Sequence, residues 1–422
     1  MTVSMLLFMY GDSAAAQSAA LLDLSRAAEV AASDELRIQI AVSSSPQARE
    51  KFAARWDAHP SLAWNELALN GIEKYRLNPL RAARLLAHLH AALHDAWVQC
   101  AQAQAGPRCV RIAQHVAGGR VMEHFLPEEA PGRFMGLATS ALASMELRAA
   151  ESPDREALVH GKTAGWGAVL RAWADGADRP LVAPQRPPPQ PGTWRPTPPL
   201  FALNPVEQGA PRWRTWLLRS GDEVMPPAPL AYGSPQYVAE VREVLDVGRN
   251  LSEARKRIAE DWNLDVGTAT PPGVWNRHAM QFIREHKLGL ESATKLLTEM
   301  NLAMFDAMVA CWAAKMKWWT ERPITEVHER FDRSFVPHLT TPSFPGYVSG
   351  HASASGAAAY VLGARIPAIK EAVLAMAAEA AMSRLYGGIH LRSDNEEGLK
   401  LGLEVGRRAI ERLDAKDQLT KR

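Results

Sequence analysis

The stretch from residue 289 to residue 323 reads GLESATKLLTEMNLAMFDAMVACWAAKMKWWTERP. Apolar side chains recur in it at three- and four-residue intervals, and no proline interrupts it before Pro323. This pattern predicts one long helix over about 289–321, which Pro323 ends. Similar Ala- and Leu-rich stretches fill most of the chain, and the alternation typical of strands is almost absent. The sequence therefore predicts an all-α protein with very little strand.

The other predicted helices follow the same signals. Asn78 and Pro79 supply an N-cap and a first helical residue, and leucines at helical spacing follow them. Helices are predicted over about 61–70, 79–103, 236–262, 274–286, 351–364, 367–386 and 394–414, with a loop over 323–348.

One long segment lacks helical texture. Between about 179 and 236 prolines cluster, and Trp194, Trp213 and Trp216 lie among them. Proline is excluded from helix interiors, and a flexible linker seldom carries so many large aromatic side chains, so an ordered strap is expected. The chain then divides into an N-terminal extension (1–60), an N-terminal helical half (61–178), the strap (179–236) and a C-terminal helical half (237–422), the two halves being parts of one large bundle.

Composition limits the partners. The 422 residues are 47% hydrophobic and 22% charged and carry a formal charge of +2. Neither nucleic acid nor an anionic membrane is therefore expected as the main partner. No apolar run reaches the roughly 18 residues that a membrane-spanning helix needs. The oligomeric state stays open, although the strap could cover a homodimer interface.

The N-terminus and the cysteines bear on the cellular compartment. Residues 5–19 resemble the tail of a signal peptide, but the apolar part is short and no basic residue precedes it. Cys100 and Cys109 could close a small loop in an oxidising compartment. Free buried thiols are nevertheless the expected state, as for Cys311, and the three cysteines show no zinc-type spacing.

Lys315 and Arg322 form the first of three charged motifs. They are seven residues apart, which is nearly two helical turns, so both project from one face of the long helix. Pro323 places Arg322 at the end of that helix. Taken alone, the pair is more typical of a solvated basic stripe.

The second motif lies in residues 342–356, PSFPGYVSGHASASG. Ser349 is a good N-cap, and the free N–H groups of a helix N-terminus bind anions. Gly350 lets a ligand approach the backbone, and His351 follows it. Taken alone, this is an ordinary helix cap beside a histidine.

The third motif is residues 383–394, SRLYGGIHLRSD. The glycine pair at 387 and 388 is typical of a helix C-cap that turns the chain, so Arg384 and His390 are expected to face one pocket. Asp394 is placed to accept the second ring N–H of His390 and orient the imidazole. On its own, His390 is more typical of a satisfied core or surface histidine.

In this order the three motifs resemble the signature shared by type 2 phosphatidic-acid-type phosphatases and vanadium-dependent haloperoxidases. One position departs from the pattern: Val348 stands where the common form has proline, and that residue is expected to shape the loop rather than to bind. The length of the chain favours the bacterial haloperoxidases, whose looser marks are Trp64-Asn65, residues 81–84, Asp95-Ala96, residues 192–196, Trp262 with Asp265, and residues 270–276.

The resemblance implies an all-α body of haloperoxidase type that holds vanadate, a site that phosphate could also occupy. His390 Nε2 would bind the vanadium, and His351 would act as acid and base. Lys315 would polarise bound peroxide, Asp394 would orient His390, and Asp265 would buttress Arg384. The residues expected to hold the oxyanion are Lys315, Arg322, Ser349, Gly350, Arg384 and His390. Trp312 and Phe344 match aromatic positions on the halide side of the pocket, although plain core positions are an equal alternative.

The implied enzyme uses hydrogen peroxide to oxidise halide to hypohalous acid, which reacts with small organic acceptors. The same residues suit an acid phosphatase, with His390 as the nucleophile and His351 as the general acid. A helical scaffold that has lost catalysis is the third hypothesis, but an empty pocket with three cations would repel itself. Cytosolic phosphate would compete for such a site, which favours a secreted or periplasmic protein over a cytoplasmic one.

Overall fold

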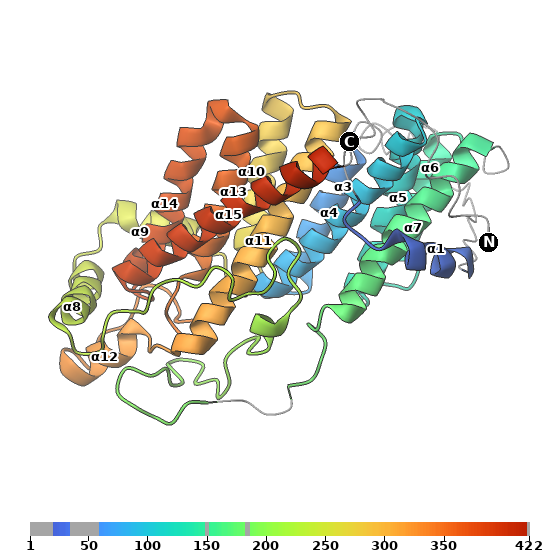
Figure 1. The fold of residues 1–422 in the computed structure, drawn as a ribbon. Helices are drawn as coiled ribbons and strands as arrows, with labels where there is room; N and C mark the ends of the chain where they lie inside the picture. The colour runs from blue at the N-terminus through green and yellow to red at the C-terminus, as the bar shows by residue number, and fades with distance from the viewer. Residues whose placement is uncertain (1–19, 34–58, 148–151, 182–185, 420–422) are drawn as a thin grey trace. The chain divides into compact units, whose positions relative to one another are not determined.

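In the computed structural model the described residues are 20–33, 59–147, 152–181 and 186–419. They form fourteen α-helices and no β-strand, so the all-α prediction is confirmed for these residues (Figure 1). The segment that resembles a signal peptide lies outside them.

The chain divides into two compact units. The first takes its described residues from 1–60, 91–169 and 413–422, and the second from 61–90 and 170–412. Every residue expected at the oxyanion site belongs to the second unit. The four-part division drawn from composition stays a prediction.

The first unit contains a disulfide. Helix α4 (Pro79–Gln102) ends just before α5 (Gly106–Phe125), and the short turn between them brings Cys100 and Cys109 to a Cα–Cα distance of 5.8 Å. The two form a disulfide, so the expectation of free thiols was wrong for this pair. Cys311 is free and buried, as expected. The other helices of this unit are α1 (Leu24–Ser33), α6 (Arg133–Ser144) and most of α7 (Ser152–Ala174).

The long helix α11 (Leu290–Trp318) forms the core of the second unit, and every residue from Leu296 to Lys315 is buried. It packs against α10 (Thr270–Glu285) and α13 (Gly350–Arg365), and α13 packs against α14 (Lys370–Tyr386). The last helix, α15 (Arg392–Leu419), approaches α13 very closely. A Cβ atom added at Gly402 would lie 2.2 Å from the Ser353 carbonyl oxygen. This glycine therefore lets α15 pack directly on the helix that begins at the candidate site.

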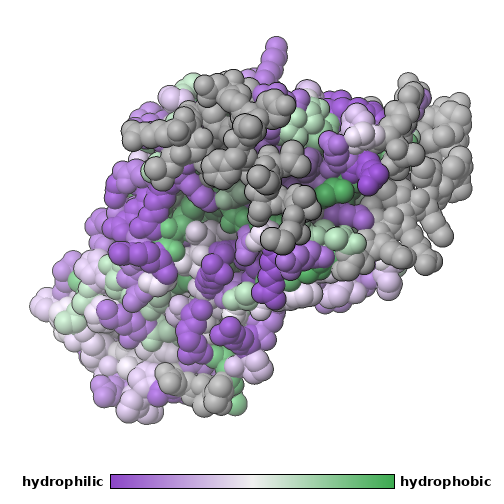
Figure 2. Space-filling view, turned by 45° about the vertical axis from the view of Figure 1, so that its right-hand side comes forward, coloured by the Kyte–Doolittle hydropathy of each residue, from purple (hydrophilic) through white to green (hydrophobic). Residues whose placement is uncertain are grey.

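Helix α11 is also long and apolar enough to cross a membrane, contrary to the prediction that no segment would be. The whole of its apolar window is buried against other parts of the protein, which is how a core helix behaves. On the face drawn in Figure 2, hydrophilic residues predominate and hydrophobic residues form smaller areas between them.

Several helix boundaries differ from the predicted ones. The helix predicted over 236–262 is two helices, α8 (Pro235–Arg249) and α9 (Glu253–Asp261), because the Ser252 side chain caps a new N-terminus by accepting the Arg255 N–H. The predicted loop 323–348 begins with α12 (Pro323–Arg330), since proline at the first helical position opens this helix after ending the previous one. Helix α3 (Pro60–Lys74) is longer than predicted, and α10 begins four residues earlier.

Hydrogen bonds and buried tryptophans hold the strap in place. Trp194 and Trp213 are buried, and the Arg171 guanidinium lies 3.7 Å from the centre of the Trp216 ring. The buried Asp306 carboxylate of α11 accepts three strap N–H groups, each at 2.7 Å, from Trp216, Leu217 and Leu218. These contacts fix the strap along α11.

Replacing Asp306 with asparagine is expected to destabilise the protein by about 2–4 kcal/mol, because the amide nitrogen would face N–H donors that the carboxylate now accepts. Urea denaturation measures this loss as a lower midpoint. The exposed Asp246→Asn is the matched control. An unchanged midpoint for Asp306→Asn would show that the three bonds contribute nothing.

Candidate active site

The three charged motifs converge in the second unit. Lys315 comes from the end of α11, His351 from the first turn of α13, and Arg384 from the last turn of α14. His351 and Arg384 line a cavity of about 40 Å³, and Lys315 lies directly behind its wall. Its lining combines a polar set, Gly350, His351, Arg384 and His390, with an apolar set that we call the apolar wall: Met308, Trp312, Phe344, Ile389 and the prolines at 79, 271 and 342.

The hydrogen bonds of His390 determine which ring nitrogen carries the proton. Nδ1 lies 2.9 Å from the Asp394 carboxylate, and Nε2 lies 3.0 Å from Nη1 of Arg322. A guanidinium can only donate, so Nε2 is the acceptor and the proton resides on Nδ1. Burial and the cations Arg322 and Lys315 hold the pKa of His390 well below its usual value. The imidazole is therefore neutral and presents an unprotonated Nε2.

Arg322 is held from several directions and still has an unused donor. Its Nε donates to the Phe344 carbonyl at 2.7 Å, and its Nη1 donates to the Ile389 carbonyl at 2.8 Å. Its Nη2 is buried and has no hydrogen-bond partner among the described residues. A buried charged donor without a partner is costly, which indicates that a ligand oxygen belongs there.

Lys315 is fully buried behind the apolar wall. Its Nζ donates to the Pro345 and Gly346 carbonyls at 2.8 Å and 2.7 Å, which leaves one of three N–H groups for a ligand. Burial, opposed in part by the nearby Cys311 and Asp394, lowers the pKa of the Lys315 ammonium to about 7. Lys315 therefore titrates near neutral pH.

Arg384 is buried among weak partners. It donates to the carbonyls of Asn263 and Ala259 at 3.4 Å and 3.3 Å. Burial and the charge of Arg322 lower the pKa of Arg384 to about 9. Burial likewise lowers the pKa of Arg322 to about 10. These cations suppress one another's charge, so the pocket favours an anion.

Asp394 is the buried carboxylate that partly balances these cations. Burial raises the pKa of Asp394 to about 6, while Lys315 and Arg322 oppose the rise. At neutral pH it is ionised and holds the His390 proton on Nδ1. The orienting contact predicted from the four-residue spacing is present.

His351 and Ser349 occupy the start of α13. His351 Nε2 lies 3.2 Å from the Asn263 carbonyl and 3.3 Å from Nη1 of Arg384. Burial and Arg384 hold the pKa of His351 well below its usual value, so this imidazole is neutral as well. The Ser349 hydroxyl accepts the Ala352 N–H at 3.5 Å as the N-cap and retains its own proton for donation.

Asp265 stands apart from the other candidate residues. It is exposed, and its carboxylate accepts the N–H of Val266. The described residues show no ion pair between Asp265 and Arg384, only a longer-range attraction that raises the pKa of Arg384. Arg384 donates instead to the hydroxyl of the neighbouring Ser383 at 3.1 Å and to the main-chain carbonyls of Asn263 and Ala259.

The apolar wall includes both aromatic residues that the sequence singles out. The rings of Trp312 and Phe344 are 5.0 Å apart, and Trp312 Nε1 donates to the Val206 carbonyl of the strap at 3.0 Å. Met308 also lines the wall and was missed. Its position four residues before Trp312, on the same helix face, was the available signal.

The affinity of the pocket for sulfate is expected to fall about tenfold between pH 6.5 and pH 8.5. Sulfate keeps a constant charge over this range, whereas Lys315, with a pKa of about 7, loses its proton as the pH rises. Calorimetric titration measures the affinity, and Lys315→Met should flatten the profile. A profile that Lys315→Met leaves unchanged would contradict the assignment.

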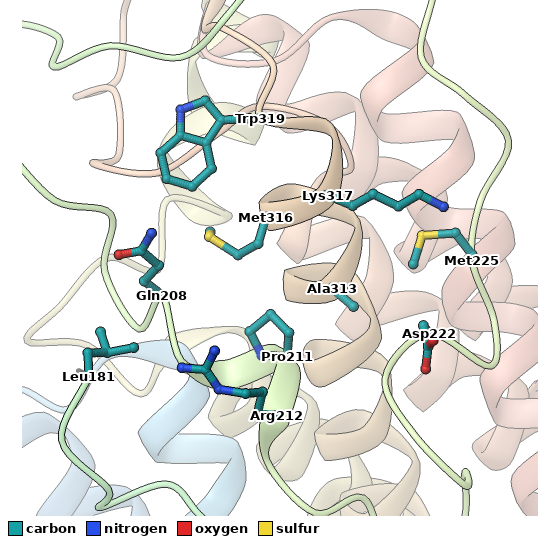
Figure 3. Close-up of a pocket in the computed structure, with 10 residues that line it drawn as sticks. All are labelled: Leu181, Gln208, Pro211, Arg212, Asp222, Met225, Ala313, Met316, Lys317 and Trp319. Carbon is teal, nitrogen blue, oxygen red and sulfur yellow. The ribbon is translucent and has the colours of Figure 1, made fainter. Parts of the chain in front are cut away.

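A larger cavity of the second unit lies elsewhere. It has a volume of about 450 Å³ and is lined by strap residues and the end of α11, with no histidine among its lining residues (Figure 3). The candidate catalytic residues lie in the smaller pocket around His390.

The fold and the site define an all-α protein that gathers buried cations around two neutral histidines, an arrangement suited to a phosphate-like oxyanion. The resemblance predicted from the three motifs is confirmed, since residues 296–412 match the model of the family described as PAP2 superfamily.

Solved structures extend the likeness beyond that segment. The chain is similar to a bacterial vanadium-dependent iodoperoxidase, with a TM-score of 0.71 and 22% identity over 83% of this chain and 95% of that one. It is also similar to a bacterial vanadium-dependent chloroperoxidase in its holo form, with a TM-score of 0.65 and 16% identity over 81% of this chain and 94% of that one. At these identities the likeness establishes the fold. A comparison with curated proteins gave no match.

Proposed function

We propose that the protein is a vanadium-dependent haloperoxidase, which converts hydrogen peroxide, halide and a proton into hypohalous acid and water. The observation that carries this proposal is the combination of a cationic oxyanion pocket with a cavity of only about 40 Å³ and an apolar wall. Such a cavity suits peroxide and a halide ion, whereas pockets for organic ligands usually start at about 300 Å³. The likeness to a vanadium-dependent iodoperoxidase and a vanadium-dependent chloroperoxidase supports the same activity.

The donor set fits vanadate. The orphaned Nη2 of Arg322, the third N–H of Lys315 and the guanidinium of Arg384 would hold its oxygens by charge-assisted hydrogen bonds, together with the Ser349 hydroxyl and the Gly350 N–H. His390 would supply the nitrogen ligand through its unprotonated Nε2, with the ligand taking the place of the Arg322 Nη1 hydrogen bond. Bound vanadate supplies a Lewis-acidic centre that activates peroxide toward halide.

The chain's own residues account for the remaining work. Asp394 holds His390 in the tautomer in which Nε2 carries no proton. The neutral His351 can accept a proton from incoming peroxide and return it to departing water. Trp312, Phe344 and Met308 exclude bulk water from the oxidant and help to strip the hydration shell of the halide.

An acid phosphatase is the second candidate function, because the unprotonated Nε2 of His390 also suits attack on phosphorus. The phosphate ester would have to enter the same cavity, with His351 protonating the leaving group. The two functions share every cationic residue and differ in what the cavity admits.

Two parallel assays separate these functions. Purified protein is loaded with orthovanadate and assayed for peroxide-dependent bromination and iodination of a dye, and vanadate-free protein is assayed for phosphate-ester hydrolysis. We expect halogenation that requires vanadate and is inhibited by inorganic phosphate. Hydrolysis without halogenation would replace the proposal with the phosphatase, and silence in both assays would indicate a scaffold.

A further inference from the structure

The candidate active site has no room for an organic acceptor. Its cavity of about 40 Å³ is far below the roughly 300 Å³ at which small-molecule sites usually begin. If hypohalous acid forms there, as proposed above, an acceptor bound to the protein has to lie outside this cavity. A groove of about 450 Å³, within the usual size range of small-ligand sites, lies on the same helix (Figure 3).

The groove is formed by the strap and the C-terminal end of α11. Leu181, Met316 and Trp319 supply apolar surface, and Gln208 and Arg212 supply polar groups on the same side of the helix (Figure 3). An apolar surface beside a few polar groups is the usual composition of a small-molecule site.

The charge of the groove favours an anion. The exposed Arg212 side chain has no ion pair or hydrogen bond among the described residues, so its guanidinium can pair with a ligand. Lys317 is a second cation, and it lies near the carboxylate of Asp222. With two cations and one carboxylate, the lining carries one net positive charge.

The groove begins one helical turn from the apolar wall of the candidate active site. Met316 follows Trp312 by four residues, so their Cα atoms are about 6 Å apart along the axis of α11. The strap joins the two places as well, because Val206 accepts the Trp312 Nε1–H at 3.0 Å and Gln208, two residues further on, lines the groove. The two places are therefore adjacent along α11 and along the strap.

We propose that this groove binds an amphipathic aromatic anion, with its carboxylate at Arg212 and its ring against Met316 and Trp319. The part of this proposal that concerns an acceptor rests on the proposed haloperoxidase function. In that role an aromatic C–H bond is replaced by a carbon–halogen bond, the halogen–oxygen bond of hypohalous acid breaks, and the ring proton leaves with the hydroxide as water.

The binding test uses 1-naphthoate and the neutral 1-naphthamide as probes, measured by calorimetry on the full-length protein. We expect naphthoate to bind more tightly than naphthamide, Arg212→Gln to weaken naphthoate about tenfold, and Arg212→Lys to restore part of the loss. Arg257→Gln is the matched control, because Arg257 is also exposed and lies outside the groove lining. Equal binding of the two probes, or an unchanged affinity in Arg212→Gln, would overturn the proposal.

The acceptor role is tested on vanadate-loaded protein. Arg212→Gln is expected to raise the KM for halogenation of naphthoate about tenfold and to leave the oxidation of iodide to triiodide unchanged. An unchanged KM would overturn the acceptor role. Absence of any peroxidase activity would contradict the proposed function alone, because the binding test decides the groove independently.

Discussion

The variant His390→Ala is expected to lose halogenation and phosphate-ester hydrolysis together, each by at least about a thousandfold. Both activities need the lone pair on Nε2, as a vanadium ligand in one case and as a nucleophile in the other. Two contacts orient this ring: Nδ1 lies 2.9 Å from Asp394, and Nε2 lies 3.0 Å from Arg322. The turnover rates of both reactions provide the measurement.

The control for this variant is His286→Ala, since His286 is exposed at the end of α10. Because His390 is buried, its removal also takes one hydrogen-bond partner from Asp394, which keeps the Leu391 N–H, and thermal unfolding must show that the variant still folds. Asp394→Asn offers an independent check: it retains the side-chain volume, no longer enforces the tautomer, and should reduce both activities. Full activity in a folded His390→Ala protein would exclude both proposed functions.

Arg322→Met is expected to weaken the binding of orthovanadate and of phosphate by about a hundredfold or more. The substitution removes a buried charge and the unpaired Nη2 donor, and hydrogen bonds to charged groups each contribute about 1.5–3 kcal/mol. It also removes the donor to His390 Nε2. Calorimetric titration with each anion measures the loss.

Arg322→Lys tests whether charge alone is sufficient. It retains one positive charge but cannot reproduce the donors at Nε, Nη1 and Nη2, so we expect it to recover only part of the affinity. The exposed Arg333→Met is the matched control. If Arg322→Met bound both anions as tightly as the original chain, the oxyanion would have to bind outside this pocket.

Local signals made much of the fold predictable. Asn78 accepts the Arg81 N–H at 3.0 Å, and α4 begins at Pro79, as the sequence indicates. Helix α11 ends within three residues of the predicted position. The predictions failed where one local signal can have two outcomes. Pro323 both ends α11 and begins α12, and Ser252 starts a new helix inside a continuous helical pattern.

In the candidate site, too, local spacing predicted some contacts and failed to predict others. The residue types and their spacing within each motif predicted the contact between His390 and Asp394, because four residues form a local distance. The expected buttress from Asp265 depends on a pairing across more than a hundred residues, and in the structure the carbonyls of Asn263 and Ala259, which are equally distant in sequence, accept from Arg384 instead. The disulfide between Cys100 and Cys109 likewise depends on how two helices turn back on each other.

The long helix from Leu290 to Trp318 and the three motifs around it were determined by the sequence alone, because helical periodicity, caps and residue chemistry act over a few neighbouring positions. The tertiary structure decided the protonation of the site, the unpaired Nη2 of Arg322 and the size of the cavity. These properties arise from burial and from the approach of distant segments, which desolvate the charges and bring the cations close to one another. A linear spacing does not contain that information.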